Sequence, residues 1–190
     1  MSRILIIDGH PDPDRARFVH ALADAYADGA ALRHEVRRID LAGLDIPLIR
    51  SQSEWMETAP PPAMAEAQQA IAWAEHLVFL YPLWLGDVPA LLKAFLEQVA
   101  RPGFAIGYGE GFPKGLLRGK SARVIVTMGM PGLFYSLVYR AHSVKSLERN
   151  VLRFVGFRPI GRTIIGSVEA DADRRREWLE EMARLGAAGE

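Results

Sequence analysis

Five short segments typical of β-strands alternate along the chain with segments whose apolar residues recur at helical spacing. The first is a run of Ile and Leu that ends at Asp8, as expected of a buried strand in a parallel sheet. The predicted strands cover residues 3–8, 35–40, 77–81, 122–127 and 159–168. The predicted helices cover residues 18–29, 63–75, 138–153 and 174–185, with one more helix after Pro89.

The same pattern predicts how these helices pack and end. Gly29 is a natural stop for the first helix. Residues 41–62 and 102–119 match neither period, so we expect irregular chain there. The helix after Pro89 is expected to bury Leu92, Phe95, Leu96 and Val99, and the last helix to pack through Trp178, Met182 and Leu185.

Strands that alternate with helices form parallel sheets with right-handed crossovers and helices on both faces. We therefore expect one α/β domain over residues 1–190, with no linker or repeat. Ligands of such sheets bind beyond the carboxyl ends of the strands. The chemistry is thus expected in loop 1 (residues 9–17), loop 2 (residues 82–88) and loop 3 (residues 128–135).

Composition excludes several classes of function. The chain has no cysteine, which excludes disulfides, thiolate catalysis and iron–sulfur clusters, and its five histidines lack the spacing of metal ligands. The 23 basic and 23 acidic side chains balance, whereas nucleic-acid-binding proteins favour a basic patch. The longest apolar stretch, residues 77–86, is about half a membrane span, and the N-terminal apolar run is too short for a signal peptide. We expect a cytoplasmic protein with no metal, nucleic acid or membrane span.

Loop 1 opens a helix, whose first turn presents unpaired N–H groups to an anion such as a phosphate. Arg15 and Arg17 could add charge-assisted hydrogen bonds. The loop has neither the three-glycine dinucleotide fingerprint nor the Walker ending. The alternative interpretation is a loop that only faces solvent and binds no ligand.

Loops 2 and 3 carry aromatic residues and glycines. Trp84 and Leu85 follow a strand end, where an exposed apolar side chain indicates a planar ligand or a partner chain; a Trp84 buried in the core is the alternative. In loop 3, Gly129 permits close approach of backbone to a ligand. Tyr135 and His142 are about two helical turns apart, which would place a phenol and an imidazole on one helix face. Together they could stabilise the charge on a bound ring that is being reduced. In the alternative, Tyr135 only packs and His142 only faces solvent.

Several segments, in order, resemble one family. They are Gly9-His10-Pro11 with Phe18, Tyr81-Pro82-Leu83-Trp84 followed by residues 88–99, residues 103–109, and Leu117-Arg118-Gly119-Lys120 before the fourth strand. Together they are similar to the flavodoxin-like NAD(P)H:quinone oxidoreductases, from residue 4 to about residue 168.

This resemblance implies a flavodoxin-like fold, strand order 2-1-3-4-5, and FMN or FAD as cofactor with NAD(P)H as hydride donor. It implies a homodimer whose active site lies at the subunit interface, where residues 104–108 contribute. Tyr135 and His142 resemble the family's catalytic pair. The implied cofactor-binding residues are His10, Arg17, Phe18, Pro82, Leu83, Trp84, Leu85, Thr127, Met128, Gly129 and Met130.

The chain also departs from the family pattern. Arg17 stands where a serine or threonine is usual, and Val19 where an asparagine is frequent. Met128 replaces one glycine of a double glycine, Leu85 replaces an aromatic residue, and the Tyr135–His142 spacing is one residue longer than expected.

The function expected from this resemblance is ping-pong transfer of a hydride from NAD(P)H, through flavin, to a quinone-like acceptor. Two other functions fit the same fold: a regulatory flavoprotein subunit of a potassium-efflux transporter, and an electron carrier of the flavodoxin type. A hydrolase is disfavoured because the chain has no glycine-x-serine-x-glycine elbow.

Overall fold

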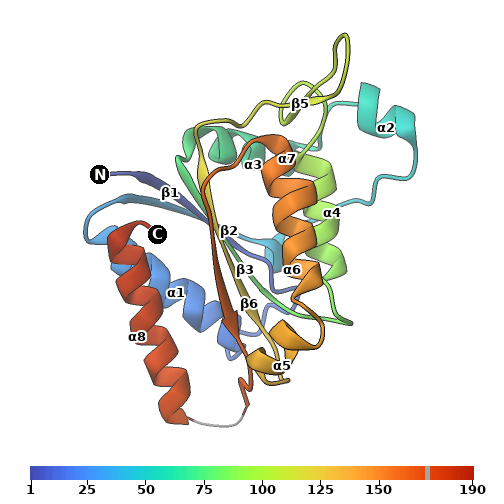
Figure 1. Ribbon diagram of the computed structural model, residues 1–190. Coiled ribbons are helices and arrows are strands. Elements are labelled where there is room, and N and C mark those ends of the chain that lie inside the picture. Colours follow the sequence, from blue (N-terminus) through green and yellow to red (C-terminus); the bar gives the residue numbers. More distant parts are fainter. Residues whose placement is uncertain (170–171) are drawn as a thin grey trace.

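The computed structural model describes residues 1–169 and 172–190 and contains one twisted parallel sheet of five strands (Figure 1). Its strand order, β2-β1-β3-β6-β7, is the expected 2-1-3-4-5 order, so the predicted fold is confirmed. The strands are β1 (Arg3–Asp8), β2 (Glu35–Asp40), β3 (His76–Pro82), β6 (Ser121–Thr127) and β7 (Ile160–Ile165).

Two helical layers cover the sheet (Figure 1). Side chains of a strand alternate between faces: Leu5 and Ile7 of β1 enter one core, and Ile4 and Ile6 the other. Because both faces are covered, residues 4–7 of this strand are all apolar. One face carries α1 (Phe18–Ala31) and α8 (Ala172–Ala188). The other carries α3 (Pro62–Trp73), α4 (Ala90–Val99), α6 (His142–Ser146), the π-helical η2 (Leu147–Leu152) and α7 (Arg153–Val155).

The helix predicted to stop at Gly29 continues to Ala31, so that boundary is wrong. Gly29 serves packing instead: a Cβ there would lie 2.0 Å from the carbonyl oxygen of Ala183 in α8. On α8, a Cβ on Gly186 would lie 2.2 Å from the carbonyl oxygen of Tyr26. The two glycines let the backbones of α1 and α8 approach closely.

The helix predicted over residues 138–153 is confirmed from His142 onward, where α6, η2 and α7 follow one another without a break, but its predicted start at Val138 is wrong. Helical structure begins earlier, in α5 (Gly132–Leu137), and resumes in α6, η2 and α7. Between α5 and α6, Arg140 and Ala141 adopt φ values of 53° and 47°, in the left-handed region that a continuing right-handed helix does not visit.

Two segments expected to be irregular contain short elements. Residues 41–62 hold the 3₁₀ turn η1 (Leu41–Gly43) and α2 (Gln52–Glu57), which begins with a capping box between Ser51 and Glu54. The buried guanidinium of Arg101 fixes α2 by donating to the carbonyls of Glu54 and Thr58 at 2.7 and 2.6 Å. Residues 102–119 contain a short antiparallel pair, β4 (Ile106–Gly107) and β5 (Lys114–Gly115).

The last strand is shorter than predicted and ends at Ile165. A Cβ on the next residue, Gly166, would lie 2.0 Å from the backbone nitrogen of Gly132. The chain here therefore packs on the start of α5 instead of extending the sheet.

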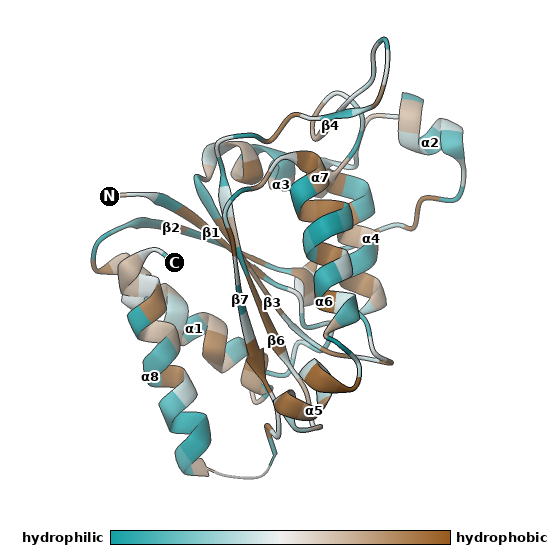
Figure 2. Cartoon of the chain, viewed as in Figure 1, coloured by the Kyte–Doolittle hydropathy of each residue, from teal (hydrophilic) through white to brown (hydrophobic). Residues whose placement is uncertain are grey.

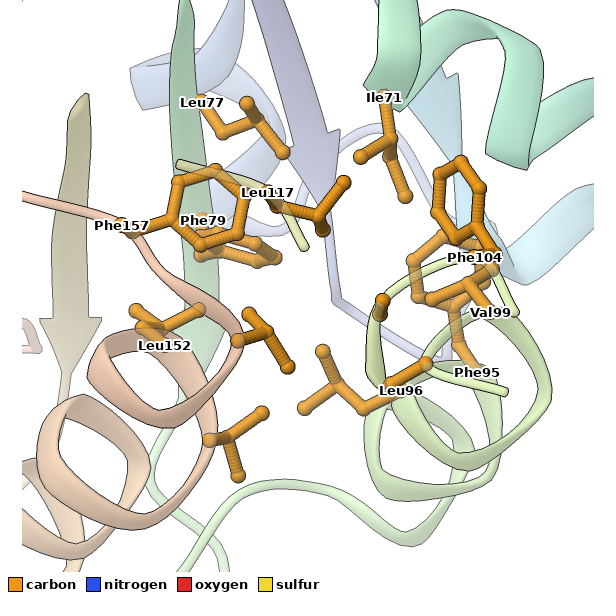
Figure 3. Close-up of a pocket in the computed structure, with 14 residues that line it drawn as sticks. Ile71, Leu77, Phe79, Phe95, Leu96, Val99, Phe104, Leu117, Leu152 and Phe157 are labelled. Atoms are coloured by element: carbon orange, nitrogen blue, oxygen red, sulfur yellow. The ribbon is translucent and has the colours of Figure 1, made fainter. Parts of the chain in front are cut away.

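The core on the α4 face encloses a small apolar cavity of about 30 Å³ (Figure 3). Side chains of β3, α4 and the η2–α7 segment line it, among them Phe79, Phe95 and Val151. A cavity of this size with no polar lining stays dry. No helix within the described ranges is long and apolar enough to cross a membrane.

Candidate functional site at the strand ends

Loops 1, 2 and 3 follow the carboxyl ends of β1, β3 and β6, which are neighbours in the sheet, and therefore meet at one end of the molecule (Figure 1). Backbone hydrogen bonds join them to the adjacent strands. Gly9 donates to the Leu80 carbonyl at 2.7 Å, and Leu83 donates to the Thr127 carbonyl at 2.8 Å. The loops thus start from fixed positions, as a ligand site requires.

The backbone of loop 1 is held by its own side chains. The N–H of His10 donates to Asp8 Oδ1 at 3.1 Å, and the N–H of Asp12 donates to Nδ1 of His10 at 3.0 Å. The N–H groups of Asp14 and Ala16 donate to the carboxylates two residues before them. No side chain caps the N-terminus of α1, so its first turn keeps donors for an anion.

The two arginines of loop 1 already have carboxylate partners. Arg17 donates to Asp12 at 2.8 Å and lies 3.7 Å from Asp14, while Arg15 makes a two-pronged pair with Asp24 at 2.7 and 2.8 Å. The pKa of Asp12 is lowered first by the N–H of Asp14 and then by Arg17. An anion at α1 would compete with these carboxylates for Arg17.

Phe18, the first residue of α1, contacts α8 through its ring. The guanidinium of Arg175, on α8, lies 4.7 Å from the centre of its ring. Phe18 also packs against the α1–α8 core. In this arrangement the ring supports the helix pair, and only the Phe18 backbone remains for a phosphate.

A buried charged cluster beneath loop 1 was not predicted. Asp8 is fully buried; its Oδ2 accepts from Arg38 at 2.8 Å and lies 2.6 Å from Nδ1 of His20, while its Oδ1 holds the loop backbone. Nε2 of the buried His20 ring lies 2.9 Å from the carbonyl oxygen of Asp12. Both ring nitrogens of His20 thus face oxygen atoms, which fix the orientation of the ring. The signal in the sequence was an aspartate at the end of an otherwise apolar strand.

The ring of His10 lies next to this cluster. The His10 ring lies 5.2 Å from the His20 ring. Burial, followed by the His20 charge, lowers the pKa of His10 below its ordinary value. His10 is therefore a neutral imidazole at neutral pH, with Nδ1 engaged by the loop backbone.

Loop 2 projects from the sheet as a tight turn. Trp84 and Asp87 exchange two backbone hydrogen bonds, at 3.0 and 2.9 Å, around Leu85 and Gly86, whose φ values are 47° and 79°. Leu85 is fully exposed and Trp84 is about half exposed. The indole meets the His10 ring edge-on at 6.0 Å, so loops 1 and 2 come together, and the alternative of a buried Trp84 is wrong.

Beside Trp84 a hollow of about 460 Å³ opens between α4 and the α6–η2 segment. Its wall is mostly apolar, with Val88 and Leu147 among the lining residues; Asp87, Lys93 and Ser146 are its polar members. Pro82 and Leu83 are half-buried at the base of loop 2. The hollow has the size and lining of a small-molecule site.

Loop 3 offers backbone more than side chains. Thr127 and Met128 are buried, and Met128 belongs to the core on the α4 face. Gly129 is exposed, with open space around it, and Met130 is half-buried with its carbonyl bound by Ser167 at 3.1 Å. A ligand at this edge would meet chiefly the backbone at Gly129.

Tyr135 and His142 do not share a helix face, so that expectation is wrong. The hydroxyl of the buried Tyr135 lies 2.5 Å from Ser143 Oγ, whereas the exposed His142 donates from Nδ1 to the Tyr139 carbonyl at 2.7 Å. The Tyr139 ring stands between them, 6.3 Å from each. The left-handed residues between α5 and α6 cause this separation.

The end of the sheet also carries exposed apolar side chains, which we call the α5 patch; the ribbon of α5 is largely brown in Figure 2. Its members are Leu133, Phe134, Leu137, Val138 and Tyr139. Contiguous apolar surface of this kind marks a binding site or an interface.

Among residues 1–169 and 172–190, no group of three or more His, Asp or Glu side chains is placed to hold a metal ion. One more buried group, the phenol of Tyr81 just before loop 2, has no hydrogen-bond partner within those ranges. Burial raises the pKa of Tyr81 well above its ordinary value, so this phenol stays protonated.

Comparisons with known proteins match the chain along nearly its whole length. A family described by its flavodoxin-like fold matches residues 2–186. FMN-dependent NADH:quinone oxidoreductase 3 of Bacillus cereus is 27% identical over 95% of this chain and 94% of its own. FMN-dependent NADH:quinone oxidoreductase of Bacillus velezensis is 30% identical over 68% of this chain and 70% of its own.

A solved structure agrees. The NAD(P)H:quinone oxidoreductase of Methanothermobacter marburgensis superposes with a TM-score of 0.86 and 26% identity, over 100% of this chain and 99% of that one. The resemblance inferred from the loops is thereby confirmed. The chain belongs to the family with the flavodoxin-like fold, in which its relatives include FMN-dependent NADH:quinone oxidoreductases.

Proposed function

We propose that the protein transfers a hydride from NADH or NADPH, by way of bound FMN, to a quinone-like acceptor. One observation carries the proposal: the uncapped N-terminus of α1 and the exposed indole of Trp84 lie at the same end of the sheet, linked through His10. A phosphate and a planar ring are the two parts of FMN that a protein must hold. The names of the relatives favour FMN over FAD.

The residues present fit this cofactor. The N–H groups of the first turn of α1 would receive the phosphate, with Arg17 as the nearby cation. The segment from Pro82 to Leu85 would lie against the ring system, and the backbone around Gly129 would meet its polar edge.

The chain's own residues bind, orient and exclude water. The hollow beside Trp84 gives an acceptor or a nicotinamide a mostly apolar wall, consistent with two half-reactions that use the same place in turn. We keep Tyr135 and His142 as the proposed catalytic pair, with different tasks. His142 retains Nε2 for a bound acceptor, while Tyr135, tied to Ser143, would position the α5–α6 turn.

We further propose that a second copy of the chain covers the α5 patch and completes the active site. Five large apolar side chains exposed next to a ligand site would be stabilised by burial against a partner. Leu137→Asp would then give the mass of a monomer in size-exclusion chromatography with light scattering. Leu32→Asp, equally exposed at the end of α1, is the matched control and should leave the dimer intact. A wild-type protein that is monomeric in solution would contradict this part.

We place the protein in the cytoplasm, where NADH and NADPH are supplied.

The test of function starts with the visible spectrum of the purified protein after addition of FMN, followed by NADH or NADPH with menadione. We expect bound flavin and turnover that depends on both substrates. Trp84→Ala should weaken FMN binding about tenfold through lost ring contact. Trp55→Ala, on the distant α2, should not. Absence of both flavin binding and nicotinamide oxidation would overturn the proposal; flavin binding without turnover would favour an electron carrier or regulatory subunit.

A further inference from the structure

A second hollow, of about 620 Å³, lies at the other end of the sheet, between the β5 segment and α7. In Figure 1 these elements lie at the end of the molecule opposite α5 and the strand-end loops. Four cationic side chains line the hollow, together with Pro113 and Phe154. The four cations are Lys114, Arg118, Arg153 and Arg158. The site described above uses none of these residues.

Two glycines bring the cations together. A Cβ on Gly115 would lie 2.3 Å from the Phe154 carbonyl oxygen, and a Cβ on Gly156, whose φ is 120°, would lie 2.9 Å from the Arg118 backbone nitrogen. The N–H of Leu117 donates to the Val155 carbonyl at 2.9 Å. The β5 segment and α7 therefore touch backbone to backbone. This contact places Lys114 and Arg118 from one segment opposite Arg153 and Arg158 from the other.

Within the described residues, the four cations have no negatively charged partner. In the part of the chain that the structure describes, no carboxylate forms an ion pair with any of them, and Arg118 only donates from Nε to its neighbour Gly115 at 3.3 Å. Nearby cations are different: Lys120 donates to the Ala72 and Ala74 carbonyls, and Arg162 pairs with Glu148. Because the whole chain is neutral, the hollow is a local excess of positive charge.

We propose that this hollow binds a phosphate-bearing anion. Three guanidinium groups and one ammonium line one concave surface, and these are the groups that bind phosphate oxygens through charge-assisted hydrogen bonds. Phe154, about two-fifths exposed, offers an apolar face to the remainder of the ligand. The phosphate belongs either to a free small molecule or to the headgroup of an acidic lipid. The site is separate from the proposed FMN phosphate site, which lies at the N-terminus of α1.

The test uses the protein saturated with FMN, so that α1 is occupied, or the flavin-free protein if FMN does not bind. Calorimetric titration with pyrophosphate should show one site per chain that weakens as salt rises. Arg118→Ala with Arg153→Ala should weaken it at least tenfold, because each removes a charge-assisted hydrogen bond. Arg33→Ala with Arg174→Ala, which removes two exposed arginines elsewhere, should have no effect.

Sedimentation with phosphatidylcholine vesicles, with and without phosphatidic acid, separates the two sources of phosphate. Pyrophosphate binding supports a free ligand, and retention on the acidic vesicles alone supports a headgroup, provided that the double variant loses it. If the Arg118–Arg153 double variant does not fold, the test is repeated with Lys114→Gln and Arg158→Gln, which replace two cations by neutral side chains. The proposal would be overturned if neither pyrophosphate nor the acidic vesicles bound. It would also be overturned if the Arg118–Arg153 and Lys114–Arg158 double variants both kept the binding of the wild type.

Discussion

His76 makes a sharp prediction about stability and pH. It is the first residue of β3, 5% exposed, with Nδ1 bonded to Ser121 Oγ at 2.7 Å and Nε2 buried without a partner within the described residues. Burial, and then the charges of Arg123 and His34, lower the pKa of His76 from 6.5 to about 4. The buried ring therefore resists protonation that the unfolded chain accepts.

The sign follows from proton binding. Between pH 6.5 and about 4 the unfolded chain binds a proton at His76 and the folded chain does not, so acidification favours unfolding. At about 1.4 kcal/mol for each pH unit, this residue should remove about 3 kcal/mol of the free energy of unfolding across that window. Such a loss is a large part of the about 5–15 kcal/mol typical of a folded domain.

The assay is urea unfolding at pH 7.5 and pH 4.5 of the wild type and His76→Asn. Asparagine does not titrate and can still bond Ser121. Carboxylates contribute to the pH dependence of both proteins, so the difference isolates His76: the wild type should lose about 2–3 kcal/mol more than the variant. Ser121→Ala, which removes the hydrogen bond but leaves the ring buried, should keep the wild-type pH dependence. Parallel losses in the wild type and His76→Asn would refute the reasoning.

Three further substitutions test the site and the packing. Asp8→Asn removes the buried charge that faces His20 and Arg38. Urea unfolding should show that the free energy of unfolding falls by about 3 kcal/mol. A fall of less than about 1 kcal/mol would mean that the fold does not need this charge. Gly29→Ala gains about 1 kcal/mol of helix propensity but places a Cβ against the α8 backbone. The clash should outweigh the gain, so the variant should unfold at a lower temperature than the wild type. A variant more stable than the wild type would contradict the close packing of α1 on α8. Val151→Ile adds a methylene toward the 30 Å³ cavity. Urea unfolding should show that the free energy of unfolding rises by up to about 0.7 kcal/mol. A fall of more than about 1 kcal/mol would show that the cavity does not accept the added methylene.

Within the candidate site, the loops were predictable and the pairing of side chains was not. Loops 1, 2 and 3 were located because ligands bind at the carboxyl ends of parallel strands. The exposed Trp84 beside His10 fits that prediction. Tyr135 and His142 were expected on one helix face, but two non-glycine residues adopt left-handed backbone conformations between them. Their residue types, arginine and alanine, give no sign of this conformation.

The sequence by itself determined the parallel α/β class of the fold, the burial of the sheet on both faces and the end at which a ligand is expected to bind, because these depend on local periodicity and on connections that must be right-handed. Only the tertiary structure decided which charges meet. Asp8 binds Arg38, which is 30 residues away, and the cations around β5 face those of α7 because Gly115 and Gly156 allow two backbones to touch. Such contacts depend on the distance between segments remote in sequence, which periodicity does not encode.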